Sequence, residues 1–226
     1  IAVSLAGRVA DLPTLKRICD RHGWALVEDA AHSLGATYVE NGTSYSSGSC
    51  AHTRAAILSF HPVKHITTGE GGAVLTHDAE LAARVRRLRS HGIVQPYSEE
   101  RPAGEGAWFY EQRELGFHYR LTDLQAALGT SQAARLPRFL ARRRELARRH
   151  ASVLAQETFA RVLQAPVFEP ASAYHLFIVH FLNADLRRRA YEFLAARNIR
   201  TQVHYIPVYR HPYYRNATTD ARAAAW

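Results

Sequence analysis

Lys64 is the residue of this sequence whose type and setting favour covalent chemistry most strongly. Only Lys16 and Lys64 are lysines, and the other 27 of the 29 basic residues are arginines. Lys16 fits the polar face of an expected helix, whereas Lys64 lies in a loop of small and polar residues between two apolar segments. A lysine, unlike an arginine, forms an imine with an aldehyde when its amine is partly desolvated. Lys64 is therefore predicted to be a reactive amine.

Asp29 follows a short apolar segment, residues 24–27, which is typical of a buried parallel strand. Ligands of open α/β sheets bind at the carboxyl ends of such strands. A helix cap or a turn residue is the alternative interpretation of Asp29, and the residue taken alone favours that alternative. The small residues at positions 30, 31, 33 and 35 would let a ligand approach the backbone, and His32 could face the same crevice.

Ser59 lies five residues before Lys64, and its hydroxyl could bind a phosphate group. The glycines of residues 69–72 indicate a tight hairpin turn, which permits close packing near Lys64. A carboxylate such as Asp29 can keep a pyridine nitrogen protonated by charge pairing. A lysine can hold an aldehyde as an imine, so this combination predicts a site for pyridoxal phosphate, a cofactor that acts as an electron sink.

The elements that must position these side chains form an α/β pattern in the first two thirds of the chain. Residues 1–5 predict a strand, Asp11 caps a helix that ends at Gly23, and a second strand leads to Asp29, which makes one βαβ unit. The other expected strands cover residues 35–39, 55–60, 73–76, 174–182 and 199–205, and the other expected helices cover residues 78–92, 122–136, 137–156 and 185–198. The pattern predicts a mainly parallel domain over residues 1–150 and a smaller α+β domain over residues 151–226.

Composition excludes several classes of protein. The 226 residues are 47% hydrophobic and 22% charged, a globular balance, and no apolar run reaches the roughly 18 residues of a membrane span. Cys19 and Cys50 are too few and too far apart for a disulfide framework or a zinc site, so a reducing cytoplasm is expected. The chain starts at Ile1 and contains no methionine, so a fragment that lacks an N-terminal part is expected.

Five motifs of the sequence resemble the DegT/StrS-type sugar aminotransferases, which are fold-type I enzymes dependent on pyridoxal phosphate. They are EDAAH (28–32), SFHPVK (59–64), TTGEGG (67–72), LGFHYRLTDLQAAL (115–128) and QVHYIPV (202–208). The resemblance covers nearly the whole chain. Around Lys64 the sequence most resembles that of 4-aminotransferases of UDP-4-keto-6-deoxy-N-acetylhexosamines, as in pseudaminic acid synthesis. A homodimer with a shared site, a nucleotide-sugar substrate and an amino donor such as glutamate are implied.

The resemblance also implies residue roles. Asp29 would pair with the pyridine nitrogen, His32 would contact the ring, Ser59 would bind the phosphate, and Lys64 would carry the imine and move the proton. His118 stands where the family has an asparagine that reaches the phosphate across the dimer interface, so that contact departs from the family pattern. Substrate binding is expected from Arg120, His204 and Tyr205. The expected missing part would hold a phosphate-binding turn and an aromatic residue stacked on the pyridine.

Three alternatives remain open. Sugar 3-dehydratases of the same family have histidine in place of the lysine, so Lys64 argues against that activity. The second alternative is a protein that binds a sugar or the cofactor without catalysis, and only turnover of substrate by the full-length chain with an amino donor would exclude it. An iron–sulfur cluster, which some relatives carry, needs more cysteines than this chain has. Residues 135–149 contain seven arginines, which could follow the phosphates of a nucleic acid, but interleaved apolar residues favour a solvated helix face. We therefore expect neither a nucleic-acid partner nor a membrane partner.

Overall fold

The computed structural model describes residues 1–96 and 100–214 of the chain. It contains two compact units, one of residues 1–156 with residues 166–178, the other of residues 157–165 with the chain from residue 179 onward. The expected domains, residues 1–150 and 151–226, stay a prediction, and residues 215–226 lie outside the described part of the chain.

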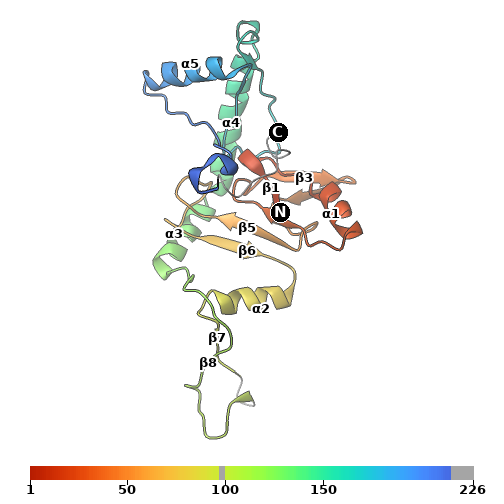
Figure 1. The fold of residues 1–226 in the computed structure, drawn as a ribbon, viewed down its shortest axis with the longest axis vertical. Coiled ribbons are helices and arrows are strands. Elements are labelled where there is room, and N and C mark those ends of the chain that lie inside the picture. The colour runs from red at the N-terminus through yellow and green to blue at the C-terminus, as the bar shows by residue number, and fades with distance from the viewer. Residues whose placement is uncertain (97–99, 215–226) are drawn as a thin grey trace. The chain divides into compact units, whose positions relative to one another are not determined.

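The first unit is built on a four-stranded sheet in the order β1, β2, β5, β6 (Figure 1). Its strands are β1 (Ala2–Val3), β2 (Val27–Asp29), β5 (Ala55–Ser59) and β6 (Gly72–Leu75). The first three strands are parallel and β6 is antiparallel to β5, so the prediction of a mainly parallel α/β sheet is confirmed. Because Asp29 pairs with Ile57, the carboxyl ends of β2 and β5 meet at one edge of the sheet.

Helices of the first unit begin at side chains that accept hydrogen bonds from the first turn. The Asp11 carboxylate accepts from the Thr14 amide at 3.2 Å, and the Asp78 carboxylate accepts from the Leu81 amide at 2.9 Å. Thr122 and Gln125 form a reciprocal capping box at the third helix. The helices are α1 (Leu12–Arg21), α2 (Ala79–Leu88), α3 (Asp123–Ala133) and α4 (Leu136–Leu154), all close to their predicted ranges, with a 3-10 turn η1 at Leu5–Gly7.

Two small antiparallel pairs complete this unit. Strands β3 (Thr37–Glu40) and β4 (Thr43–Ser46) form a hairpin, whose turn residues Asn41 and Gly42 both have positive φ angles, as a two-residue hairpin turn requires. Strands β7 (Ile93–Val94) and β8 (Glu111–Gln112) form the second antiparallel pair.

The core of the first unit consists of two buried clusters. Leu12 of α1 packs with Ala2 and Leu26 beside the sheet. Leu140 of α4 packs with Ala36 and Ala173. Helix α4 therefore connects the segment around residue 173 to the chain that follows β2.

The second unit has an α+β character in its described part. Strand β9 (Leu163–Gln164) pairs antiparallel with β10 (His180–Phe181), and Asn183 caps helix α5 (Ala184–Ala195). Short 3-10 turns lie at Glu157–Phe159, Val208–Arg210 and Pro212–Tyr214. No helix within residues 1–96 and 100–214 is long and apolar enough to cross a membrane.

Two strand predictions were wrong in extent. Only residues 180 and 181 of the expected strand 174–182 form a strand, because the chain before them bonds elsewhere: the Ala173 and Leu176 amides donate to the carbonyls of Gly7 and Ala6. The expected strand 199–205 is not a strand in the described structure; the Ile199 amide donates back to the carbonyl of Leu194 and closes the end of α5.

Candidate active site

Asp29 and Ser59 lie at the same edge of the sheet, because each ends one of two adjacent parallel strands. One carboxylate oxygen of Asp29 accepts a hydrogen bond from the Ala31 amide at 3.1 Å, which fixes the turn after β2. The Ser59 hydroxyl oxygen accepts from the His61 amide at 3.4 Å. Its own O–H therefore remains available as a donor to an anion.

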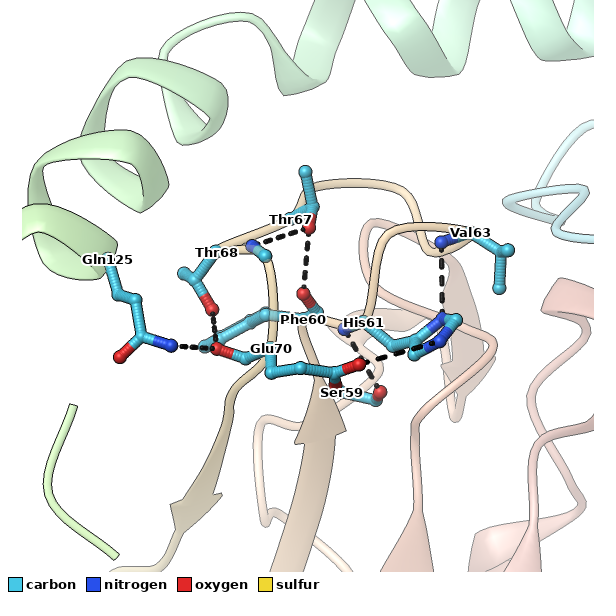
Figure 2. A network of polar contacts seen from close by, with 9 residues as sticks. Ser59, Phe60, His61, Val63, Thr67, Thr68, Glu70 and Gln125 are labelled. Atoms are coloured by element: carbon cyan, nitrogen blue, oxygen red, sulfur yellow. Dashed lines mark hydrogen bonds and ion pairs between the residues drawn. The ribbon is translucent and has the colours of Figure 1, made fainter. Parts of the chain in front are cut away.

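The loop that carries Lys64, residues 60–71, is closed at its base by hydrogen bonds of the Phe60 backbone, and Figure 2 shows the one from the Thr67 hydroxyl. The Phe60 amide donates to the Gly71 carbonyl at 2.8 Å. The Phe60 carbonyl accepts from the Thr68 amide and from the Thr67 hydroxyl, each at 3.0 Å. Lys64 ends a turn inside this loop, where its amide donates to the His61 carbonyl at 2.9 Å. These bonds fix the position from which the Lys64 side chain starts.

Helix α3 fastens the far side of the same loop. The Glu70 carbonyl accepts from the Thr68 hydroxyl at 2.6 Å and from the Gln125 side-chain amide at 3.0 Å (Figure 2). The packing between them is tight, since a Cβ atom added at Gly129 would lie 2.8 Å from a methyl carbon of Thr68. Gln125 thus serves two purposes, the cap of α3 and an anchor of the lysine loop.

The Lys64 side chain is half-buried, and its amine lies near enough to the Asp29 carboxylate to interact with its charge. Burial lowers the pKa of Lys64 below its usual value, and the negative charge of Asp29 opposes that shift. Burial wins because removing water disfavours the ammonium form more than this single carboxylate favours it. The structure therefore brings together Asp29 and Lys64, two of the predicted site residues, and leaves the lysine easier to deprotonate than an exposed one.

Three imidazole rings line the region beside Lys64. The ring of His175 lies between those of His32 and His65, with centroid distances of 4.2 Å and 5.6 Å. His32 accepts a hydrogen bond at Nδ1 from the Ala6 amide at 3.4 Å. His65, which is only 4% exposed, is hydrogen-bonded through Nε2 to the carbonyl of Ala173 at 3.1 Å.

Two of these histidines are neutral at physiological pH. Burial, followed by the positive charge of Arg143, lowers the pKa of His65 to about 4. Burial, followed by the neighbouring His32 and the charge of Lys64, lowers the pKa of His175 to about 3. A neutral imidazole adds no positive charge beside the Lys64 amine.

Arginines of α4 hold the segment that contains His175. The Arg143 guanidinium donates to the carbonyls of Tyr174 and His175 at 3.0 and 3.4 Å, and burial lowers its pKa. Arg144 donates to the carbonyls of Ser172 and Gly35 at 2.9 and 3.0 Å. Two of the seven clustered arginines are thus bound to the protein's own backbone, which corrects the expectation of a uniformly solvated helix face.

Sequence reasoning did not single out His65, His175 or Arg143. His65 stands directly after Lys64, and that adjacency was a usable signal. His175 was assigned to a strand, although a histidine within an apolar run is a position worth testing for a polar role. Nothing in the sequence distinguishes Arg143 from its neighbouring arginines.

A buried carboxylate stands beside Asp29 in the chain. Glu28 is 1% exposed and accepts from the hydroxyls of Ser4 and Ser47 at 2.8 and 2.7 Å and from the Gly48 amide at 2.9 Å. These three donors satisfy the carboxylate and tie β2 to the chain after β1 and after β4. Glu28 therefore holds the strand whose last residue is Asp29.

His118 and Arg120 lie in the segment between α2 and α3, where His118 forms a β-bridge with Ser90. The His118 ring contacts that of His91 with a centroid distance of 5.0 Å, and its Nε2 lies 3.3 Å from Arg120. Their segment is fixed to the end of α2 by the Phe117 amide, which donates to the Leu88 carbonyl at 2.7 Å. No hydrogen bond or ring contact of the described residues joins His118 to Lys64 or to the two strand ends.

His204 and Tyr205 belong to the second unit, where both are exposed and their rings lie 4.4 Å apart. Their part in substrate binding stays a prediction.

Comparison with known proteins identifies related sequences and folds. Residues 1–225 match the DegT/DnrJ/EryC1/StrS aminotransferase family. A Helicobacter pylori UDP-4-amino-4,6-dideoxy-N-acetyl-beta-L-altrosamine transaminase is 30% identical over 223 residues, which are 98% of this chain and 55% of the relative. The chain spans about half the length of the curated relatives it matches.

Solved structures of aminotransferases are also similar to this chain in fold and sequence. PseC of Helicobacter pylori, an aminotransferase involved in the biosynthesis of pseudoaminic acid, is 29% identical with a TM-score of 0.80, over 98% of this chain and 57% of PseC. Spr1654 of Streptococcus pneumoniae in its PMP form is 27% identical with a TM-score of 0.81, over 98% of this chain and 59% of that one. Spr1654 is also similar in its PLP form, with a TM-score of 0.78 at 26% identity, over 98% of this chain and 58% of that one.

Proposed function

The chain belongs to the DegT/DnrJ/EryC1/StrS aminotransferase family, and from that premise we propose that its protein is a pyridoxal phosphate-dependent sugar aminotransferase. The reaction would move an amino group from an amino-acid donor, glutamate, to a keto group of a nucleotide-linked deoxysugar. The names of the Helicobacter relatives support this substrate class, and we propose a place in polysaccharide biosynthesis.

The observation that carries the proposal is the setting of the Lys64 amine. It is desolvated, it lies close to the Asp29 carboxylate, and its loop leaves the sheet at the edge where Ser59 ends β5. A surface lysine has neither a lowered pKa nor a carboxylate at a strand end beside it. An amine that loses its proton readily is what attack on an aldehyde requires.

The residues at this edge fit pyridoxal phosphate. Asp29 has acceptor capacity beyond its one bond to the Ala31 amide, so it can accept the pyridinium N–H. The Ser59 hydroxyl keeps a donor for the phosphate, and His32 can contact the ring. When bound, the cofactor supplies an electron sink for the transfer.

In this arrangement Lys64 has two tasks. As a free amine it would hold the cofactor through its aldehyde group, and when released it would serve as the side chain that holds and moves a proton. Asp29 keeps the ring nitrogen protonated throughout, because a paired carboxylate favours the charged form.

We further propose a homodimer in which His118 and Arg120 act in the partner's site. The segment around these two residues exposes large apolar side chains that a partner would cover: Leu115, Phe117, Tyr119 and Leu124. Large apolar surfaces of this kind are typical of interaction sites. The protein is proposed to act in the cytoplasm, where both cysteines stay reduced. His204 and Tyr205 are proposed to contact the sugar.

Borohydride trapping tests the proposal. Pyridoxal phosphate is added to the protein as its gene encodes it, borohydride reduces any imine, and peptides are mapped by mass. We expect a pyridoxyl mass on the peptide with Lys64 and none on the peptide with Lys16, which is a built-in control because it forms an ordinary exposed ion pair with Asp20. No adduct on Lys64 of the folded protein would refute the assignment.

A further inference from the structure

His65 follows Lys64 directly in the chain, at the point where the loop turns from the surface into the interior. Val63, on the other side of Lys64, is 60% exposed, whereas His65 is 4% exposed and Ile66 is 7% exposed. Consecutive Cα atoms are about 3.8 Å apart. Whatever holds the His65 side chain therefore also limits where the Lys64 backbone can lie.

The group that holds the His65 side chain is a backbone carbonyl of a distant segment. The Nε2 atom of His65 lies 3.1 Å from the carbonyl oxygen of Ala173, a residue 108 positions further along the chain. A carbonyl oxygen only accepts hydrogen bonds, so Nε2 carries a proton and donates it. Ala173 is fully buried, and a buried carbonyl needs a donor of this kind.

Ala173 is itself held in place, so the bond from His65 ends at a fixed point. The Ala173 amide donates to the Gly7 carbonyl at 2.8 Å, and the Ala173 side chain packs with Leu140 of α4. Arg143 donates to the carbonyl of the residue after Ala173 at 3.0 Å, and Arg144 donates to that of the residue before it at 2.9 Å. The carbonyl that accepts from His65 thus lies between two carbonyls that α4 holds.

The other bonds of the loop leave the stretch around Lys64 less restricted. The Gln125 side chain holds the carbonyl of Glu70, which lies six residues beyond Lys64. The Lys64 amide bonds locally, to the carbonyl of His61 three residues earlier, and a local turn of this kind can shift as a body. The bond from His65 to Ala173 removes that freedom next to the lysine.

We propose that His65 is a positioning residue of the lysine site, whose bond to the Ala173 carbonyl fixes the backbone point from which the Lys64 side chain starts. A lysine side chain is a flexible four-carbon stem, so its amine meets a reactant reproducibly only when that starting point is fixed. A displacement of about 1 Å can slow a reaction about 100-fold. The inference rests on the proposed function in treating Lys64 as the reacting amine.

Two substitutions separate the bond from the ring. His65→Gln loses the ring and keeps a side-chain N–H donor for the Ala173 carbonyl, whereas His65→Ala loses both. His52→Ala is the matched control, because it removes a half-buried histidine of the same unit whose Nδ1 lies 2.7 Å from the hydroxyl oxygen of Tyr38 instead. If His65→Ala does not fold, His65→Leu, which fills space without a donor, takes its place.

The first measurement is hydrogen exchange of the peptide that contains residues 61–68, in the protein as its gene encodes it and without added cofactor. We expect the amides of this peptide to exchange about 2–10-fold faster in His65→Ala, the factor that one net hydrogen bond represents. Exchange in His65→Gln and in His52→Ala should match that of the unsubstituted protein.

The second measurement is the initial rate at which pyridoxal phosphate and borohydride place a pyridoxyl group on Lys64, taken where circular dichroism shows each variant to be folded. We expect His65→Ala to lower this rate about tenfold or more, and His65→Gln and His52→Ala to leave it near that of the unsubstituted protein. A histidine that only stabilised the fold would leave the rate of the folded protein unchanged.

Equal exchange in His65→Ala and the unsubstituted protein would overturn the proposal, as would faster exchange with an unchanged trapping rate. A loss of trapping that His65→Gln fails to restore would also overturn it, because the effect would then belong to the ring and not to the bond. No adduct on Lys64 of the unsubstituted protein refutes the proposed function instead, and the exchange rates still decide whether His65 holds the loop.

Discussion

Gly7 is the position where the structure makes the sharpest prediction about stability. Its φ angle is +103°, and a Cβ atom there would lie 2.4 Å from the amide nitrogen of Tyr174. A backbone atom at that distance must move. The same movement would weaken the bond from the Ala173 amide to the Gly7 carbonyl, which is 2.8 Å long. Gly7→Ala is therefore expected to separate η1 from the segment that carries His175.

The expected size of the effect comes from comparison with Gly23→Ala. Gly23 has a φ angle of +65°, and a Cβ atom there would meet nothing within 4 Å. Gly23→Ala should lower the free energy of unfolding by only about 1–2 kcal/mol, the cost of a left-handed conformation. Gly7→Ala adds a steric clash and weakened hydrogen bonds, so a decrease of about 3–6 kcal/mol is expected.

Urea unfolding followed by circular dichroism measures both variants against the unsubstituted protein. The informative quantity is the difference between the variants, because both replace a left-handed glycine by alanine. If the two decreases agreed within about 0.5 kcal/mol, the close contact between residues 7 and 174 would not exist in solution and the reasoning would be refuted.

Three further changes have defined outcomes. Gln125→Glu keeps the cap of α3 but loses the donor to the Glu70 carbonyl, so it should lower the free energy of unfolding by about 0.5–1.5 kcal/mol. Gln125→Ala loses both contacts and should lower it further. A Gln125→Glu variant with the same urea midpoint as the unsubstituted protein would contradict the role of Gln125 as an anchor. His65 has its pKa lowered to about 4, so its stabilising contribution is complete above pH 6.5 and is lost as the pH falls toward 4; His65→Gln should flatten that part of a stability–pH curve, and an unchanged slope would exclude His65 as the cause. Glu28→Gln removes a charged acceptor from three buried donors and should cost about 1–3 kcal/mol in thermal or urea unfolding, whereas no loss would mean that the donors find other partners.

The sequence predicted the parallel part of the fold because local signals there agree with tertiary structure. Asp11 and Asp78 cap helices as expected, and an inner strand ends at Asp29 as expected, although it begins only at Val27 and leaves residues 24–26 of the apolar segment outside it. The proximity of Asp29 to the loop that carries Lys64 also follows from the sequence, since the carboxyl ends of adjacent parallel strands lie at the same edge of a sheet.

The rest could not be predicted, because it depends on contacts between distant segments. The apolar pattern at residues 174–178 has the composition of a strand, but the amides of Ala173 and Leu176 donate to the carbonyls of Gly7 and Ala6 instead of to a neighbouring strand. The neutral state of His175 arises from burial among groups that lie far apart in the chain. Local propensity carries no information about either.

The long sequence separations within the site have a consequence for the nascent chain on the ribosome. The bond between His65 and Ala173 joins residues 108 positions apart, and the bond between Arg144 and Gly35 joins residues 109 positions apart. Translation therefore completes the sheet and the loop that carries Lys64 well before Arg144 and Ala173 have been synthesised. Until Ala173 emerges and docks, His65 lacks the bond to its carbonyl. The candidate site is therefore completed only after contacts between distant segments form, and contacts of this kind form slowly during folding.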